Sequence, residues 1–403
     1  MEQKNSIVER KNGTFFWGIK KNIFFLGLVS LLTDISSDMV YPLLPVFLTD
    51  VLGSSKVFVG LIEGVAESTA SILKIFSGWF SDKIGKRKPI VILGYSLSSI
   101  SKPLLALVTS AWQVLFIRFA DRTGKGIRTS PRDALISETS DGQRRGASFG
   151  LHRAMDSAGA ILGPLLAFVL LPLLNKNYQH LFLLASIPAF FSILVLFVWV
   201  KEAKTRKEKV PLAEKKASFK FDAKFKLFVL VVALFTLGNS SDAFLFLRAR
   251  NLGVNLVFIP LLWGLFHLVY TLSSIPAGVL SDKIGRRKII LFGFLIYGLS
   301  YLGFAFANRS LHAWILFAIY GVYYGLTDGA LRAFVADLVK DEGKRGTAYG
   351  FYHGAVGFCA LPASLILGYL WQTFGAHVAF SFGAVLALLA GVIFYIGFSE
   401  KDK

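Results

Sequence analysis

The chain has 403 residues, of which 54% are hydrophobic and 17% charged, and its formal net charge is +19. Apolar stretches of about 20 residues, each long enough to cross a bilayer, recur along it, and this excludes an ordinary soluble protein. The positive charge could indicate nucleic-acid binding. However, Lys and Arg are gathered in alternate connecting segments, as in membrane proteins whose cytoplasmic loops are basic. We therefore expect a membrane protein with no nucleic-acid partner.

Twelve apolar spans are predicted, in two groups of six. Residues 1–21 are polar and form a cytoplasmic N-terminus, and residues 22–200 form the first group. Its spans lie at about 22–52, 57–80, 89–108, 112–130, 146–174 and 180–200. The charged stretch 201–226 is a cytoplasmic linker. Residues 227–398 form the second group, with spans at about 227–250, 256–280, 289–307, 311–338, 346–371 and 376–398, and residues 399–403 are a cytoplasmic tail.

Prolines should alter the shape or the length of two of these spans. Pro42 and Pro45 should bend the outer half of the first span, because proline cannot continue a helix. The basic run 122–132 is predicted to be the cytoplasmic end of the fourth span, which should stop before Pro131.

The two groups of spans are copies of one unit. Ser77–Lys88 returns as Ala277–Lys288 with eight of twelve positions identical, at an offset of 200 residues. Arg145–Gly150 returns as Arg345–Gly350 at the same offset. A repeat at half the chain length indicates a duplicated unit. Gly85 supplies the backbone freedom that a tight turn between two spans requires.

The repeated segment resembles motif A of the major facilitator superfamily, Gly-x-x-x-Asp-x-x-Gly followed by basic residues, which lies between helices 2 and 3 and again between helices 8 and 9. The resemblance implies an all-α membrane protein of 12 transmembrane helices in two six-helix bundles, and a transporter without a cofactor rather than an enzyme. It also implies that the acid of the motif contacts the other half near helix 11, here around Gly346. The residues of the gating motif would be Gly78, Asp82, Gly85, Arg87, Gly278, Asp282, Gly285 and Arg287.

Ionisable side chains inside the spans are candidates for ion coupling, because a charge in the membrane is costly unless it is paired or hydrated. Asp34 and Asp38 are one turn apart on the first span, and Glu63 and Glu67 are one turn apart on the second. Arg118 on the fourth span is the expected counter-charge. A carboxylate in an apolar, partly hydrated site can exchange protons near neutral pH. The alternative is that these acids form static ion pairs.

The fifth span carries Gly159, Gly163 and Pro164, in a pattern similar to motif C of the superfamily's drug/proton antiporters. The match is partial, since Ala167 and Phe168 stand where the motif has two glycines. Small residues let helices approach closely, and we expect this packing at the interface between the halves. The resemblance favours export.

Two further sets of residues could bind a ligand. His152 and Asp156 are one turn apart and could ligate a metal ion together with His267 or His353, but a hydrogen-bonded histidine is the favoured interpretation, so no metal site is expected. A flat hydrophobic or cationic substrate could contact side chains on the first, seventh and tenth spans, where lipid or helix contact is the alternative role. These candidates are Tyr41, Asp242, Phe246, Tyr324 and Asp328.

The sequence thus predicts a monomeric secondary transporter of the cell inner membrane, surrounded by lipid, with both termini cytoplasmic. Its expected activity is proton-coupled efflux of hydrophobic or cationic compounds by alternating access, with the proton as the coupling ion. Two other transport activities remain open: export of divalent cations such as nickel or cobalt, and proton-linked import. From a different class, the chain could be a non-transporting membrane sensor.

Overall fold

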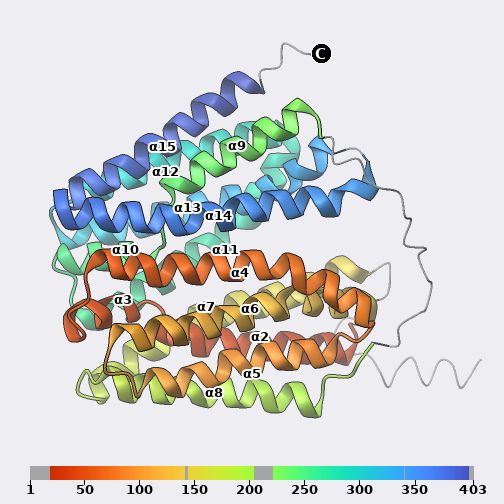
Figure 1. Ribbon diagram of the computed structural model, residues 1–403, viewed down its shortest axis with the longest axis horizontal. Helices are drawn as coiled ribbons and strands as arrows, with labels where there is room; N and C mark the ends of the chain where they lie inside the picture. Colours follow the sequence, from red (N-terminus) through yellow and green to blue (C-terminus); the bar gives the residue numbers. More distant parts are fainter. Residues whose placement is uncertain (1–18, 141–143, 204–220, 340, 399–403) are drawn as a thin grey trace, which may run out of the picture.

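The computed structural model describes residues 19–140, 144–203, 221–339 and 341–398, so most of the predicted N-terminus, linker and tail lies outside the described residues. The regular elements of these residues are helices. They form two bundles of six spans that lie side by side (Figure 1). The predicted all-helical, twelve-span fold is confirmed.

The first bundle is built from a broken first span and five continuous helices. These elements are α2 (Lys21–Val40), α3 (Leu44–Val46) with a π-helical turn (Phe47–Val51), α4 (Lys56–Ile84), α5 (Lys88–Leu105), α6 (Ala111–Thr139), α7 (Arg145–Leu173) and α8 (Tyr178–Val198).

The second bundle repeats this plan. Its elements are α9 (Ala223–Gly238) and α10 (Ala243–Asn251), a short 3-10 turn (Leu256–Phe258) leading into α11 (Ile259–Ile284), α12 (Arg286–Phe306), α13 (Ser310–Leu338), α14 (Glu342–Phe374) and α15 (Ala376–Gly397). Among the described residues, eight helical segments are long and apolar enough to cross a membrane by length and composition alone. The other spans, α4, α5, α6 and α13, carry many of the polar side chains of the interior.

The repeated motif forms much shorter turns than predicted. Gly85 ends α4 with φ +68°, and Gly285 joins α11 directly to α12 with φ +95°. Only glycine adopts such positive φ values without strain. Because the flanking helices extend into the motif, the predicted ends of the spans near residues 80 and 280 are four residues too early.

We call the end of the molecule that contains these turns the basic end, and the other the opposite end.

The first and seventh spans are both interrupted. α2 ends at Val40, and a turn containing Pro42 precedes α3, which has Pro45 in its first turn. This confirms the predicted bend, since proline lacks the N–H that a continuous helix needs. The seventh span is interrupted at residues 239–242, where Asn, Ser, Ser and Asp can bond to the backbone in place of helical hydrogen bonds.

The fourth span does not stop before Pro131, so that prediction is wrong. α6 continues to Thr139 with Pro131 inside it. Its basic residues are not a solvated helix end either, because Arg122 and Arg128 are buried. Packing against α4 and α5 along its length stabilises this helix, and such tertiary contacts outweigh the one hydrogen bond that proline removes.

The two bundles share a hydrophobic core only toward the opposite end. There Leu44 and Phe47 of the first bundle belong to one buried cluster with Phe244 and Phe246 of the second, and each is at most 1% exposed. The buried cluster near the basic end, around Tyr95, contains residues of the first bundle alone. The molecule is therefore closed between the bundles at the opposite end.

Helices α4 and α14 form the long contact between the bundles and lie next to each other in Figure 1. Gly64 of α4 faces the backbone of Leu361, and Gly357 of α14 faces Ser71, so glycines permit the close approach. The hydroxyl of Ser68 donates to the carbonyl of Gly357 at 2.6 Å. Closer to the basic end, Gly346 and Gly354 of α14 have no atom within contact distance of an added Cβ. Gly350, between them, has the side chain of Ile75 of α4 at 4.0 Å from an added Cβ, so the contact with α4 is looser at this end.

Candidate substrate and coupling site

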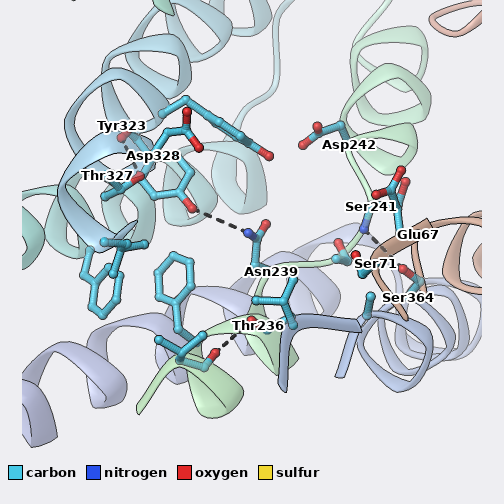
Figure 2. Close-up of a pocket in the computed structure, with 18 of the residues that line it drawn as sticks. Glu67, Ser71, Thr236, Asn239, Ser241, Asp242, Tyr323, Thr327, Asp328 and Ser364 are labelled. Carbon is cyan, nitrogen blue, oxygen red and sulfur yellow. Dashed lines mark hydrogen bonds between the residues drawn. The ribbon is translucent and has the colours of Figure 1, made fainter. Parts of the chain in front are cut away.

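A cavity of about 290 Å³ lies between the bundles. Most of its wall comes from α9, the interruption of the seventh span, α13 and α14, and the first bundle contributes Tyr41, Glu67 and Ser71. Figure 2 shows the polar side chains around it. Each charged residue in its lining is an acid: Glu67, Asp242 and Asp328.

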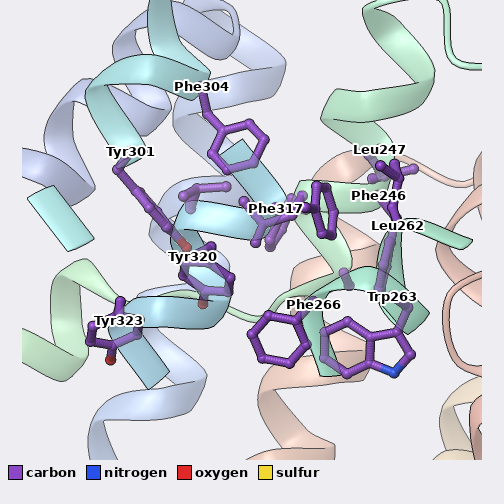
Figure 3. Close-up of a cluster of buried hydrophobic side chains, with 14 of the residues drawn as sticks. Phe246, Leu247, Leu262, Trp263, Phe266, Tyr301, Phe304, Phe317, Tyr320 and Tyr323 are labelled. Atoms are coloured by element: carbon purple, nitrogen blue, oxygen red, sulfur yellow. The ribbon is translucent and has the colours of Figure 1, made fainter. Parts of the chain in front are cut away.

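Four of the five residues predicted for the substrate cleft line this cavity: Tyr41, Asp242, Tyr324 and Asp328. The fifth, Phe246, does not. It is fully buried and packs edge to face against Tyr41, with ring centroids 5.7 Å apart. It packs in the same way against Trp263, at 5.3 Å, and Figure 3 shows these two side chains. Its role is to fill the shared core, because it is fully buried in the cluster common to both bundles and does not reach the cavity wall.

The interruption of the seventh span brings a carboxylate to the cavity wall. Asp242 stands at the start of α10, where a negative charge is favourable to the helix dipole. Its carboxylate accepts a hydrogen bond of 2.6 Å from the hydroxyl of Tyr320. Within the described part of the chain, Asp242 has no ion pair. The backbone N–H of Ser241, freed from helical bonding, donates to Ser364 at 3.2 Å.

The second cavity acid, Glu67, has a partner in the first bundle. Its carboxylate lies 3.5 Å from the guanidinium of Arg122, whose Nε is buried without a hydrogen-bond partner in the described residues. The guanidinium groups of Arg118 and Arg122 lie over the ring of Tyr41, 5.6 and 5.8 Å from its centroid. These charges therefore hold the Tyr41 ring in the cavity wall.

Glu63 forms the most buried ion pair of the first bundle. Both of its oxygens accept from Arg118, at 2.7 to 3.0 Å, and the two side chains are 1% and 5% exposed. Asp121 lies 3.4 Å from Arg118 and 3.3 Å from the ammonium group of Lys102. The expected counter-charge, Arg118, thus pairs with Glu63. Lys102 was not among the predicted residues, although a lysine within an apolar span is the same signal that identified the acids.

The four predicted coupling acids do not form one cluster. α2, which carries Asp34 and Asp38, packs mainly against α7 and α8, whereas α4, which carries Glu63 and Glu67, packs mainly against α6 and α14. The carboxylate of Asp38 accepts a hydrogen bond of 3.0 Å from the indole of Trp263 in the other bundle. The carboxylate of Asp34, which is partly buried, makes no hydrogen bond or ion pair with any described residue.

Asp34 lies instead among charges contributed by α6 and α7. The charges of Lys125 on α6 and Asp156 on α7 are close enough to act on the carboxylate of Asp34. Lys125 is an exposed residue of α6, and its ammonium group has no ion pair with a described residue. A carboxylate and an ammonium group without fixed partners can each change their interactions when the molecule changes conformation.

The glycines of the fifth span pack within the first bundle, not across the interface as predicted. An added Cβ at Gly159 would lie 2.5 Å from the carbonyl oxygen of Leu31, and one at Gly163 would lie 2.6 Å from that of Ile35. Both contacts are to α2, and they bring Asp34 and Asp38 against α7. Of the three motif residues, Pro164 is the one whose contact with the other bundle is seen among the described residues: a Cβ added at Gly264 would lie 3.7 Å from the Cβ of Pro164.

His152 is a hydrogen-bonded histidine in this structure. Its Nε2 lies 3.0 Å from the hydroxyl of Ser30, and its Nδ1 lies 3.8 Å from Asp156. Neither His267 nor His353 joins them: the described residues contain no group of three or more His, Cys, Asp and Glu side chains that could hold a metal ion.

The first copy of the gating motif is an ion-pair cluster at the basic end. Arg87 lies 2.6 Å from Asp82 and 3.0 Å from Glu138 of α6. The side chain of Asp82 is 69% exposed. The predicted contact of Asp82 with the region of Gly346 is absent from the described residues, where Asp82 pairs with Arg87 and an added Cβ at Gly346 would meet open space.

The second copy uses a different arginine from the one predicted. Arg286 lies 3.7 Å from Asp282 and pairs with Asp337 of α13, whereas Arg287 donates to the carbonyl of Tyr395 at 2.8 Å. The shift arises because α12 begins one residue after Gly285, so Arg286 and not Arg287 faces the end of α11. Gly278 has open space around it, unlike Gly78, which faces Ser130 at 3.4 Å.

Comparisons with known proteins agree with this architecture. The family model described as Major Facilitator Superfamily matches residues 26–266 and 227–403. The chain is 39% identical, over 97% of its length and 96% of the relative, to the uncharacterised MFS-type transporter MJ1317 of Methanocaldococcus jannaschii. It is 23% identical, over 93% of its length and 92% of the relative, to the multidrug resistance protein MdtH of Salmonella newport.

Among solved structures, a bacterial homologue of the human lysosomal transporter Spinster, in an inward-facing and occupied conformation, is similar to this chain. The TM-score is 0.75 at 15% identity, over 93% of this chain and 96% of that one. At this identity the similarity concerns the fold alone.

Proposed function

Because the chain belongs to the major facilitator superfamily, and is thus a membrane transporter of small molecules rather than an enzyme, we propose that it is a proton-coupled exporter of small hydrophobic or cationic compounds. The described conformation, closed at the opposite end, represents one state of an alternating-access cycle. The multidrug resistance protein among its distant relatives supports export, though at 23% identity only weakly.

The observation that carries this proposal is the lining of the cavity. Its charged residues are acids, and four tyrosines, Tyr41, Tyr323, Tyr324 and Tyr352, stand among them. A cation gains about 0.5–2 kcal/mol over an aromatic ring, the more so when it has lost its water. Asp242, which has no ion pair with a described residue, would neutralise the charge of the ligand. An aromatic, acidic cavity therefore favours flat organic cations.

The side from which the described cavity is reached is inferred from charge and conformation together. Basic residues flank the turns at the basic end, and such residues remain on the cytoplasmic side of membranes. With the bundles closed at the opposite end, substrate would enter the cavity from the cytoplasm. Release on the other side requires the bundles to separate at the opposite end and close at the basic end.

For proton coupling we favour Asp34 among the four acids predicted from the sequence. Glu63 and Glu67 have arginine partners, and Asp38 accepts from Trp263, so their charges are stabilised in place. Asp34 has no such partner among described residues. A carboxylate in this position can take up a proton and give it up when Lys125 or another cation approaches.

A cell-based assay tests the proposal. N-methylacridinium is a permanently charged, fluorescent, flat cation, and acridine is its neutral counterpart near neutral pH. In a bacterial host without its own drug pumps, the wild-type chain should lower accumulation of N-methylacridinium severalfold. Asp242→Asn, at equal expression, should abolish that effect because the cavity loses its unpaired acid. Equal accumulation with and without the wild-type chain would contradict export of this class of compound.

A further inference from the structure

One ionic contact crosses between the bundles on the side where α7 meets α11. Arg153 of α7 donates to the hydroxyl of Tyr270 at 2.6 Å and lies 3.4 Å from the carboxylate of Asp328. Tyr270 in turn donates to the same carboxylate oxygen at 2.8 Å. Arg153 of α7 and Tyr270 of α11 thus converge on one carboxylate oxygen of Asp328, which belongs to α13. Of these three residues, only Arg153 comes from the first bundle.

Asp328 takes part both in the cavity wall and in the contact between the bundles. It is part of the cavity wall, as Figure 2 shows, and it anchors the contact with Arg153. Arg332, one turn along α13, also pairs with it. A ligand that brought a positive charge to this part of the wall would compete with Arg153 for the same carboxylate.

We propose that Arg153 occupies a cation subsite at Asp328 and Tyr270 in the empty transporter, and that a substrate must carry a positive charge to displace it. Displacement removes the ionic contact that ties α7 to Tyr270 of α11 and Asp328 of α13, so substrate charge is linked to the movement of the bundles. Arg153 is then a specificity-determining residue of the transporter. This inference rests on the proposed function, because it needs a cationic substrate in the cavity.

The exposure of the pair is consistent with displacement. The side chains of Arg153 and Asp328 are 56% and 34% exposed, in contrast to the 5% and 1% of Arg118 and Glu63. An ion pair as exposed as that of Arg153 and Asp328 contributes about 0–1 kcal/mol to stability. A ligand can therefore replace one of the two partners at little cost in free energy. A neutral ligand offers Asp328 no replacement charge and leaves the contact in place.

Binding to the purified protein gives the first test. Arg153→Gln should bind N-methylacridinium roughly threefold to fivefold more tightly than the wild type, the gain expected when a competing contact of about 1 kcal/mol is removed. Its affinity for acridine should not change. Tyr270→Phe, which retains all charges but removes the bridging hydroxyl, should shift affinity in the same direction by a smaller factor.

The distance between the bundles gives the second test. Spin labels at Lys86→Cys and Lys283→Cys, two exposed positions at the basic end, can be used after Cys359→Ala. In the wild type, N-methylacridinium should change the label distance and acridine should not. In Arg153→Gln the distance should already be changed, with no further response. Arg332→Gln is the matched control, because it removes a charge beside Asp328 without breaking a contact between bundles; it should keep the response.

The outcomes separate the two claims. If the wild type does not bind N-methylacridinium, both the proposed function and this inference are overturned. If it binds, but Arg153→Gln has unchanged affinity or retains the ligand-dependent change in distance, the inference alone is overturned.

Discussion

The buried charges of the first bundle differ in whether a partner fixes them. Glu63 and Arg118 form a bidentate pair with almost no exposure, and Lys102 with Asp121 extends it to two acids and two bases. Such a group is neutral as a whole, which lowers the cost of placing it in a membrane. Asp34 has no equivalent arrangement among described residues. The paired group around Glu63 and Arg118 suits structural stability, whereas the carboxylate of Asp34 suits proton exchange.

Glu63→Gln should therefore destabilise the protein. It leaves Arg118 buried with only the more distant Asp121, and breaking a buried pair from one side costs about 3–5 kcal/mol. Thermal unfolding of the purified variant should show a clearly lower midpoint.

Asp50→Asn is the control for this variant, because Asp50 lies 3.4 Å from Arg250 with both side chains about 40% exposed. It should change the stability by less than about 1 kcal/mol. Equal midpoints for the two variants would mean that the Glu63 pair contributes nothing.

At the residue scale, the sequence identified acids but not their partners. The rule that ionisable groups inside spans are functional selected Asp34, Glu63 and Asp242 without structural information. It could not say which would be paired, because a partner depends on which helices pack together and on their rotation. Glu63 and Asp34 look equivalent in the sequence and have opposite surroundings in the structure.

Among the helices of the first bundle, α7 packs very closely against α2. Gly159 and Gly163 face backbone carbonyls of α2 at distances that a side chain cannot occupy. This contact fixes the face of α2 that carries Asp34 and Asp38. The similarity to motif C predicted close packing at these glycines, but not the partner, because small residues permit an approach without selecting which helix makes it.

Gly159→Ala should destabilise the protein by about 1–3 kcal/mol, since its Cβ would overlap the Leu31 carbonyl and force the two helices apart. Gly150→Ala on the same helix has open space around it and should be neutral or slightly stabilising, because alanine favours helix more than glycine does. Thermal unfolding of the two variants makes the comparison. A similar loss of stability in both would indicate a general effect of helix α7, not of this contact.

Taken as a whole, the molecule is a duplicated fold with an unequal division of roles. The repeat at offset 200 predicted two matching bundles, and the structure has them. The repeat could not predict that the cavity wall would come mainly from the second bundle. That asymmetry depends on the polar interruption of the seventh span and on the tyrosines of α13, two features that the first bundle lacks.

The orientation of the molecule is a prediction at this scale. Reporter domains inserted after Ala203, at the basic end, and after Asn175, in the turn between α7 and α8, should report opposite sides of the membrane, with Ala203 in the cytoplasm. Reporters on the same side would contradict a membrane crossing by α8, and with it the twelve-span topology.

Proton-driven movement of a cation through the purified protein is the most direct test of the proposed function. In proteoliposomes with an acidic interior, wild-type protein should accumulate N-methylacridinium inside, because protons leaving down their gradient are exchanged for the cation. Asp34→Asn should still bind the cation but should no longer respond to the gradient. Accumulation by the wild type that is the same with and without a pH gradient, or an unaltered gradient response in Asp34→Asn, would contradict the account of a proton-coupled exporter that uses Asp34.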